Sequence, residues 1–452
     1  MNLDKSSSNQ YQQPSALRVC LDQVKPFIVS FSLDSKGSRI LQNSIVLAEQ
    51  STREIVFQQL FPYSQHLMKN QFANFVLQEF FNYDPLQSLV IEIIGSDIYY
   101  TRYSLIEMNA MQNQSSTTEV TKPAPSPKMN WSKVDYMKYR DESFVLRLAC
   151  LMKDRMIDLS FDKHSCRVVQ RSLELLPFDV STQLIQELQP CIILAVNDHN
   201  ANHVIQKIVR TQPPNSFLFL LEALADIHVV KEILTNQFSC RVVQHIIDNS
   251  PVTMSGTLIR TLINQSNDLV TSSYGNYIMQ KIILSSYPNA SRDILVALSG
   301  RIAELCLHKY SSNVIEKICE YGTDADRRSI INEFMRFQGG SQVMKQHPIV
   351  SLLLDTYANY VVQKVLICCG VELRESLCRI IINNAQILSS SMHWRHIITS
   401  LNKVAGSISD QHLRQQVLNL VSSNARYLRG TTFPTGNSDT DSRLSPRDFF
   451  TQ

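Results

Sequence analysis

A five-residue core that returns eight times constrains the fold of this chain more than any other feature. The string SCRVVQ occurs at residues 165–170 and again at 239–244, and related strings such as ANHVIQ and ANYVVQ occur elsewhere. The cores begin at residues 38, 74, 166, 202, 240, 276, 312 and 359, so the successive gaps are 36, 92, 36, 38, 36, 36 and 47. A period of this size indicates a solenoid of stacked units, each burying its apolar face against its neighbours.

Helical geometry divides the five positions of each core between surface and interior. At about 100° per residue, positions one, two and five fall on one face of a helix, and positions three and four fall on another. Positions three and four are Val, Ile, Leu or Met in every core, so we expect them to pack inward. Each unit would then present positions one, two and five on a surface that continues from unit to unit.

Composition excludes several classes of protein. Hydrophobic residues make up 44% of the 452 residues, which is ample for a continuous core, and the net charge of +3 does not by itself predict a polyanionic partner. The ten cysteines form no CxxC pair, and we find neither a secretory signal nor an apolar run long enough for a membrane span. No nucleophile–base or metal-ligand motif is visible. We therefore expect a reduced intracellular protein without enzymatic activity, metal or cofactor.

The spacing also predicts the organisation of the chain. Residues 1–13 and 429–452 are polar and are expected to be disordered, with the repeat domain spanning 14–428. The gap of 92 places an insertion at about 84–140, between the second and third units. It is either an expelled loop or a segment, within 88–106, that packs on the array or binds a partner. The gap of 47 indicates a longer loop near 338–346, and the helical segments after the last core look like a degenerate terminal unit.

The residue types at the surface positions suit unpaired bases. Position five is Gln in seven cores and Glu in one, position one is Ser, Cys or Asn, and position two is Arg, Tyr, Phe, His or Asn. A Gln amide offers a donor and an acceptor, which match adenine or uracil, whereas a carboxylate only accepts and therefore suits the adjacent donors of guanine. Flat side chains at position two can stack on bases. The alternative is that these are ordinary surface residues of a protein-binding helical repeat.

With these cores the chain resembles the PUF (Pumilio-homology) family of RNA-binding proteins over about residues 14–428. The resemblance implies an all-α fold, a right-handed crescent-shaped α-solenoid of eight PUF repeats plus degenerate terminal caps, with single-stranded RNA antiparallel along its concave face. It also implies a cytoplasmic monomer that binds messenger RNA 3′ untranslated regions and, through deadenylase and other regulators, represses translation or promotes decay. Two alternatives stay open: a protein-binding α-solenoid scaffold of armadillo type, and a nucleolar PUF-like ribosome-assembly factor.

The family's recognition pattern can be carried over unit by unit. The pairs expected at base edges are Ser38 and Gln42 for adenine, Asn74 and Gln78 for uracil, Cys166 and Gln170 for adenine, Asn202 and Gln206 for uracil, Cys240 and Gln244 for adenine, Asn276 and Gln280 for uracil, Ser312 and Glu316 for guanine, and Asn359 and Gln363 for uracil. The stacking residues would be Arg39, Phe75, Arg167, His203, Arg241, Tyr277, Asn313 and Tyr360.

From the last unit to the first, these pairs imply the site 5′-UGUAUAUA-3′. The UGU triplet is the firmest part of it. The insertion and the gap of 38 could loosen recognition of the 3′ bases or let a central base turn away. Lysines that directly follow position five either support the RNA phosphates or are simply solvated: Lys207, Lys281, Lys317 and Lys364.

Overall fold

The computed structural model describes residues 24–86, 141–233, 236–337 and 347–425, and all regular structure in these ranges is helical. None of the helices described there is both long and apolar enough to span a bilayer. The chain divides into two compact units, one up to Ala297 and one from Leu298. The all-α solenoid prediction is confirmed. The terminal tails and the loop at 338–346 lie outside the described residues, as does nearly all of the insertion.

Three kinds of helix alternate along the chain: a short first helix, a core-bearing helix and an outer helix. In the first compact unit they are α2 (Ile28–Leu33), α3 (Ser35–Leu47), α4 (Gln50–Leu60), α5 (Ser64–Met68), α6 (Ala73–Phe80), α8 (Phe144–Met152), α9 (Met156–Phe161), α10 (Ser165–Leu173), α11 (Phe178–Gln186), α12 (Ile192–Asn197), α13 (Ala201–Thr211), α14 (Leu218–Leu224), α15 (Ile227–Ile233), α16 (Gln237–Asn249), α17 (Val252–Asn264), α18 (Ser266–Thr271), α19 (Gly275–Leu284) and α20 (Ala290–Ala297). In the second they are α21 (Ile302–Cys306), α22 (Ser311–Tyr321), α23 (Asp324–Arg336), α24 (Pro348–Leu354), α25 (Ala358–Cys368), α26 (Val371–Asn383), α27 (Ala385–Leu388), α28 (Trp394–Val404) and α29 (Gln411–Ser423).

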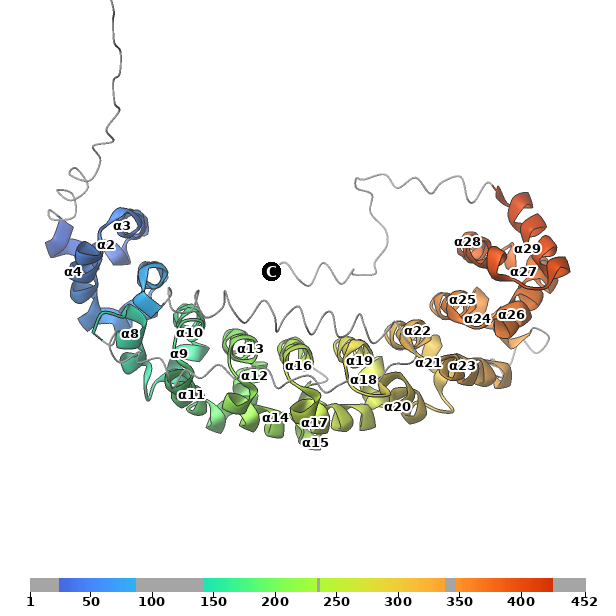
Figure 1. Ribbon diagram of the computed structural model, residues 1–452, viewed down its shortest axis with the longest axis horizontal. Coiled ribbons are helices and arrows are strands. Elements are labelled where there is room, and N and C mark those ends of the chain that lie inside the picture. Colours follow the sequence, from blue (N-terminus) through green and yellow to red (C-terminus); the bar gives the residue numbers. More distant parts are fainter. Residues whose placement is uncertain (1–23, 87–140, 234–235, 338–346, 426–452) are drawn as a thin grey trace, which may run out of the picture. The chain divides into compact units, whose positions relative to one another are not determined.

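Helices of the same kind lie side by side within each compact unit. In the first, the core-bearing helices pack in the series α3, α6, α10, α13, α16 and α19; in the second, α22 packs on α25 and α25 on α28. Figure 1 shows α10, α13, α16 and α19 along one edge, with α11, α14 and α17 along the opposite edge. Each of the two compact units thus has a layer of core-bearing helices and a layer of outer helices.

A capping residue four positions before position one sets the start of each core-bearing helix. Asp162, for example, accepts hydrogen bonds from the backbone N–H groups of His164 (3.0 Å) and Ser165 (2.8 Å). Short side chains that can bond to their own backbone favour such turns. The same pair of contacts is made by Asp34, Asn70, Asp198, Asn236, Ser272 and Asp355. At the eighth such position, His308 accepts one hydrogen bond, from the backbone N–H of Tyr310 (3.3 Å). This turn puts position one in the first turn of each helix.

Positions three and four form the interior of the core-bearing layer, as the pattern predicted. Both are at most 1% exposed in every core from the second onward, for instance Val204 and Ile205. The first core differs, because Leu41 is buried but Ile40 is 49% exposed. In the described part of the chain no core-bearing helix precedes α3, so position three of this core lacks the neighbour that buries it in the other cores. The prediction that Ile40 packs inward is therefore wrong.

The spacing of the cores predicted an insertion at the boundary between the second and third units. The structure shows instead that the insertion interrupts the second unit. Helix α8, which follows it, packs against α5 of the second unit and beside α11, the outer helix of the third. Phe144 of α8 contacts Phe80 of α6, with ring centroids 5.1 Å apart. Helix α8 is thus the outer helix of the second unit.

A buried carboxylate ties the two ends of the insertion together. Asp84 is 2% exposed and accepts hydrogen bonds from the Ser143 hydroxyl (3.0 Å) and from the backbone N–H groups of Leu86 (3.0 Å) and Val145 (2.8 Å). Burial raises the pKa of Asp84, although these hydrogen bonds oppose the shift. Asp84 thereby fixes where the chain leaves and re-enters the second unit.

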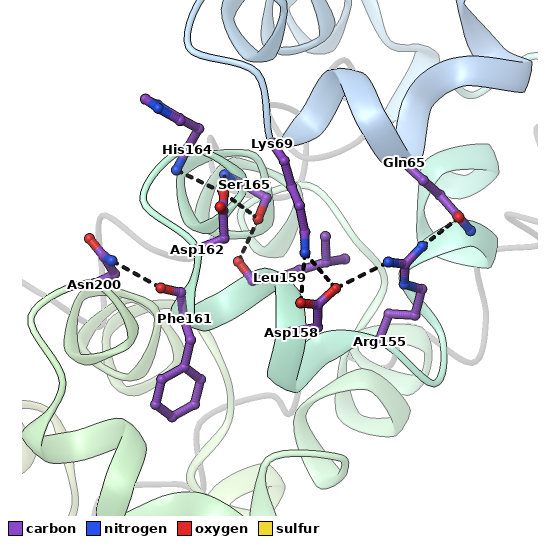
Figure 2. A network of polar contacts seen from close by, with 10 residues as sticks. All are labelled: Gln65, Lys69, Arg155, Asp158, Leu159, Phe161, Asp162, His164, Ser165 and Asn200. Carbon is purple, nitrogen blue, oxygen red and sulfur yellow. Dashed lines mark hydrogen bonds and ion pairs between the residues drawn. The ribbon is translucent and has the colours of Figure 1, made fainter.

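Figure 2 shows how the second unit is also joined to the third. The Lys69 ammonium lies 2.6 Å from the Asp158 carboxylate, and Arg155 contacts both Asp158 (3.1 Å) and Gln65. Lys69 and Gln65 belong to the second unit, and Arg155 and Asp158 to the third. With α6 packed on α10, the second core therefore continues directly into the third despite the insertion.

Because the ends of the insertion meet at Asp84 and Ser143, we expect its removal to leave the fold intact. Replacing residues 87–140 by a short Gly/Ser linker should keep the helical circular dichroism and shift Tm by only a few degrees. Asp84→Ala with the insertion retained is the control. It should lower the free energy of unfolding by about 1–3 kcal/mol, because buried donors lose their acceptor. A linker variant less stable than Asp84→Ala would contradict this account of the junction.

Candidate RNA-binding surface

Position one forms the floor of the surface in every core. Its side chain is at most 4% exposed in all eight, including Ser38, Cys166 and Asn202. The serines and Cys166 donate to the backbone carbonyl three residues earlier, as in Ser38 to Ser35 (3.2 Å). Burial raises the pKa of Cys166, and it raises that of Cys240 to about 12, so both thiols stay protonated at neutral pH. Where position one is Ser or Cys, the small side chain leaves space at the surface between positions two and five.

Where position one is Asn, a relay of hydrogen bonds fixes the direction of the Gln amide at position five. In α13, Asn202 Nδ2 donates to the Asp198 carbonyl (2.7 Å), so its Oδ1 faces Gln206, whose Nε2 donates to it (2.7 Å). The same relay links Asn74 to Gln78, Asn276 to Gln280 and Asn359 to Gln363. A flipped Gln would set two carbonyl oxygens against each other. The outward order of acceptor and donor is therefore set, which allows one base type to be preferred.

Where position one is Ser38 or Cys240, the acceptor of the Gln amide is the backbone carbonyl of position one, whereas Gln78 in an Asn core donates both to that carbonyl (3.2 Å) and to the Asn side chain. Nε2 of Gln42 donates to the backbone carbonyl of Ser38 (3.1 Å), and Nε2 of Gln244 donates to that of Cys240 (3.2 Å). An Asn at position one therefore adds a side-chain acceptor for the Gln amide, which Ser and Cys do not supply. This is the physical basis for expecting two base preferences from Gln-containing cores.

Position two lies further out, as expected of a stacking group. Arg39, Arg167 and His203 are exposed, and Phe75 is 43% exposed. The remaining position-two residues are half-buried: Arg241, Tyr277, Asn313 and Tyr360. Arg167, His203 and Arg241 lie on the neighbouring core-bearing helices α10, α13 and α16. They are close enough to interact electrostatically. Although His203 is exposed overall, desolvation of the part of its ring that neighbouring atoms cover lowers its pKa, and the charges of Arg241 and then Arg167 lower it further.

We expect His203 to titrate below its ordinary value of 6.5 in the free protein. Its folded form holds a proton less tightly than the unfolded chain does, so His203 makes the free energy of unfolding decline as pH falls below about 6.5. Arg241→Gln should raise the His203 pKa, because it removes one of the two neighbouring positive charges. Titration of the imidazole resonances by NMR measures both values, and an unchanged pKa in the variant would contradict the placement.

In three of the core-bearing helices, position six, immediately after the core, is a lysine that joins the helix to the one before it. Lys207 pairs with Glu174, and Lys281 lies 2.9 Å from Asp248. Lys364 lies 3.4 Å from Glu316. These three lysines were expected at RNA phosphates or in solvent, but each forms an ion pair with the preceding unit. The fourth, Lys317, pairs with Glu320 of its own helix (3.1 Å).

The eighth core has a partner that the sequence did not predict. Gln363 is only 7% exposed, and its Oε1 accepts a hydrogen bond from the Ser400 hydroxyl (2.8 Å) on α28. Sequence reasoning missed Ser400 because Arg395 and Thr399 stand at positions one and five of its helix, where the other cores have Ser, Cys or Asn and Gln or Glu. The available signal was spacing, since Arg395 of α28 follows Asn359 by 36 residues.

The structure brings the predicted site residues into two series: six cores from α3 to α19, and two on α22 and α25. Within the described ranges, no group of His, Cys, Asp and Glu side chains could hold a metal ion. The surface offers amide and carboxylate edges, flat or cationic side chains and a buried floor. These are the features needed to bind unpaired bases.

Comparison with known families supports this interpretation. A family model for the Pumilio-family RNA binding repeat matches residues 27–61, 65–93, 155–189, 230–259, 267–297, 301–335 and 348–382, which together make up just over half of the chain. Helix α13 falls outside these matches, although it shows the same capping turn and amide relay as the matched helices. The third matched segment begins after α8, consistent with α8 belonging to the second unit.

Two curated relatives illustrate the similarity. A Pumilio domain-containing protein of Schizosaccharomyces pombe is 24% identical over 380 residues, covering 83% of this chain and 46% of that protein. Fem-3 mRNA-binding factor 2 of Caenorhabditis elegans is 27% identical over 244 residues, covering 49% of this chain and 39% of that protein. The chain thus spans about half the length of these relatives or less.

Solved structures share the fold. PUF-8 in complex with PBE-RNA superposes with a TM-score of 0.65 at 23% identity, covering 85% of this chain and 94% of that chain. The Puf3 RNA binding domain bound to site B of the Cox17 RNA 3′ UTR gives a TM-score of 0.59 at 22% identity, covering 89% and 95%.

Proposed function

Because the chain belongs to the Pumilio family of RNA-binding repeat proteins, we propose that it binds single-stranded RNA sequence-specifically along its core-bearing helices. The observation that carries this proposal is the amide relay. Four Asn–Gln pairs have a fixed order of donor and acceptor. Helical geometry puts each pair on the same face of its helix as the position-two residue. Family membership also supports the prediction that the chain is not an enzyme, since the family is defined by an RNA-binding repeat.

The proposed target is 5′-UGUAUAUA-3′, with one base for each core from the eighth to the first. Guanine is assigned to the seventh core, because Glu316 supplies the one acceptor-only position-five side chain among the eight cores. The direct packing of α6 on α10 supports continued recognition across the insertion. The gap between Asn202 and Cys240 is 38 residues, two more than the usual 36. A base in the middle of the site is therefore where we expect the spacing of bound bases to be least regular.

The proposed cellular role is repression of translation or promotion of decay of messenger RNAs that carry this element in their 3′ untranslated regions. The chain would act in the cytoplasm as a monomer and recruit deadenylase and other regulators. Supporting facts are that one relative is named an mRNA-binding factor and that the Puf3 domain was solved on a 3′ UTR sequence. The loop at 338–346, which lies outside the described residues, is a candidate contact for such a partner.

A reporter messenger RNA tests this role. Its 3′ untranslated region should carry either UGUAUAUA or the same element with its guanine replaced by cytosine. Expression of the chain should lower protein output and shorten the poly(A) tail only for the intact element. Equal output from both reporters, with the chain concentrated in the nucleolus on imaging, would contradict the proposal and favour ribosome assembly.

A further inference from the structure

Helix α28 continues the register of the core-bearing helices past the last predicted core. Arg395 follows Asn359 by 36 residues, and Ser391, four residues before Arg395, accepts a hydrogen bond from the His393 backbone N–H (3.1 Å), as the other capping residues do. Ile397, at position three, is fully buried. The ring of His396, at position two, lies 6.0 Å from the ring of Tyr360. In this register Ser400 occupies position six, as Lys364 does on α25.

The direction of every hydrogen bond around Gln363 is determined by its neighbours. Asn359 Nδ2 donates to the carbonyls of Asp355 (2.8 Å) and Thr356 (2.9 Å), so Asn359 Oδ1 must face Gln363. Gln363 Nε2 donates to that oxygen (2.9 Å), and Gln363 Oε1 therefore faces the Ser400 hydroxyl, which donates to it (2.8 Å). Ser400 is 5% exposed. Among the described residues, Gln363 is the one position-five Gln whose carbonyl oxygen accepts a hydrogen bond.

Position six makes an equivalent contact one core earlier. Lys364 Nζ lies 3.4 Å from Glu316 and 3.6 Å from Glu320. Although burial opposes the shift, these carboxylates raise the pKa of Lys364. In the first compact unit the lysines at position six pair with Glu174 and Asp248, which lie beyond position five. Contact between position six and the preceding base-edge residue is thus found at Glu316 and Gln363.

We propose that Ser400 and Lys364 are positioning residues that sharpen base selection by the side chain in front of them. Ser400 holds the Gln363 amide in one orientation, and Lys364 holds the Glu316 carboxylate in place through their 3.4 Å contact. Uracil presents a donor at N3 and an acceptor at O4, whereas cytosine presents the reverse order and needs a flipped amide. Flipping Gln363 breaks its bond to Asn359 and its acceptance from Ser400. This inference rests on the proposed function, because it assumes that these cores recognise uracil and guanine.

Ser400→Ala tests the uracil half of the proposal. The ratio of affinities for UGUAUAUA over CGUAUAUA should fall by roughly threefold to tenfold, the equivalent of one net hydrogen bond. The preference for guanine at the second base should stay as it is in the unaltered chain. Ser400→Thr keeps the hydroxyl and should keep the ratio of the unaltered chain. Ser400→Cys has nearly the volume of Ser but a weaker donor, so its ratio should fall as in Ser400→Ala. The control is Thr399→Ala, because Thr399 Oγ1 donates within its own helix to the Arg395 carbonyl (2.8 Å).

Lys364→Met tests the guanine half. The preference for UGUAUAUA over UAUAUAUA should fall by roughly threefold to tenfold, because a Glu316 carboxylate without its Lys364 contact is held less well in line with the two donors of guanine. Lys281→Met is the matched control: it removes a lysine at the same position, but that lysine pairs with Asp248 and not with a base-edge residue. Its base preferences should not change. A positioning role also leaves the salt dependence of binding unchanged.

Unchanged base ratios in both Ser400→Ala and Lys364→Met would overturn the proposal. So would a salt slope of log affinity that becomes shallower by about 0.7 in Lys364→Met, because that marks a lost phosphate contact. The unaltered chain separates this failure from failure of the proposed function. If it does not discriminate among these RNAs, the proposed function fails; if it discriminates and the variants do so equally well, only the positioning role fails.

Discussion

Glu316→Gln is expected to move the preference at the second base of the RNA from guanine to adenine. The reason is the similarity of the first and seventh cores. Ser38 and Ser312 are both 3% exposed and both donate to the carbonyl three residues earlier, at 3.2 and 3.3 Å. With Gln at residue 316, the seventh core would have the same pair as Ser38 and Gln42. The amide can match adenine, whereas guanine would lose a charge-assisted acceptor.

The size of this change follows from the chemistry of the lost contacts. Hydrogen bonds to charged groups contribute about 1.5–3 kcal/mol each, so affinity for UGUAUAUA should fall by roughly a hundredfold. Affinity for UAUAUAUA should rise above it. Fluorescence anisotropy at one fixed salt concentration measures both. If the variant keeps its preference for guanine, Glu316 is not the residue that recognises that base.

Phe80→Ala is expected to produce the largest loss of stability among the substitutions considered. Phe80 is fully buried between Phe57 and Phe144, with ring centroids 5.2 and 5.1 Å away. These rings come from the first unit and from both sides of the insertion. Truncation leaves a cavity where three helices meet and should lower the free energy of unfolding by about 3–5 kcal/mol. Urea denaturation should show the loss as a lower midpoint or as early unfolding of the N-terminal repeats.

Phe75→Ala on the same helix is the matched control for Phe80→Ala. Phe75 is 43% exposed at position two, so its removal should change stability little. It should instead weaken RNA binding by roughly 1–3 kcal/mol, through loss of base stacking. If the two variants lost stability equally, Phe80 would not be the anchor of this junction.

The sequence predicted the solenoid and most of its interior because the helical period alone decides which side of a core faces inward. Val204 and Ile205 lie where that period places them. Ile40 does not, because burial of position three needs a neighbouring helix, and a pattern within one unit says nothing about where the array begins.

Two features of the site depended on partners that spacing does not identify. The gap between cores measures how many residues an insertion adds, but not which helix comes first after it, so the insertion was placed between the second and third units although it interrupts the second. Ser400 and Lys364 act through contacts with another helix, to Gln363 and Glu316. Spacing places the helix of Ser400 in register, but only the folded chain shows which atom its hydroxyl faces.

Equilibrium binding to UGUAUAUA RNA, beside the same RNA with its guanine changed to cytosine, tests the central claim most directly. The two measurements should share one stated salt concentration, because phosphate contacts make affinity salt-dependent. We predict tight binding to the first RNA and a loss of roughly a hundredfold or more for the second, because Glu316 would face a base without two adjacent donors. Equal binding to both RNAs, or binding to neither, would contradict base recognition by the cores and favour a protein-binding solenoid.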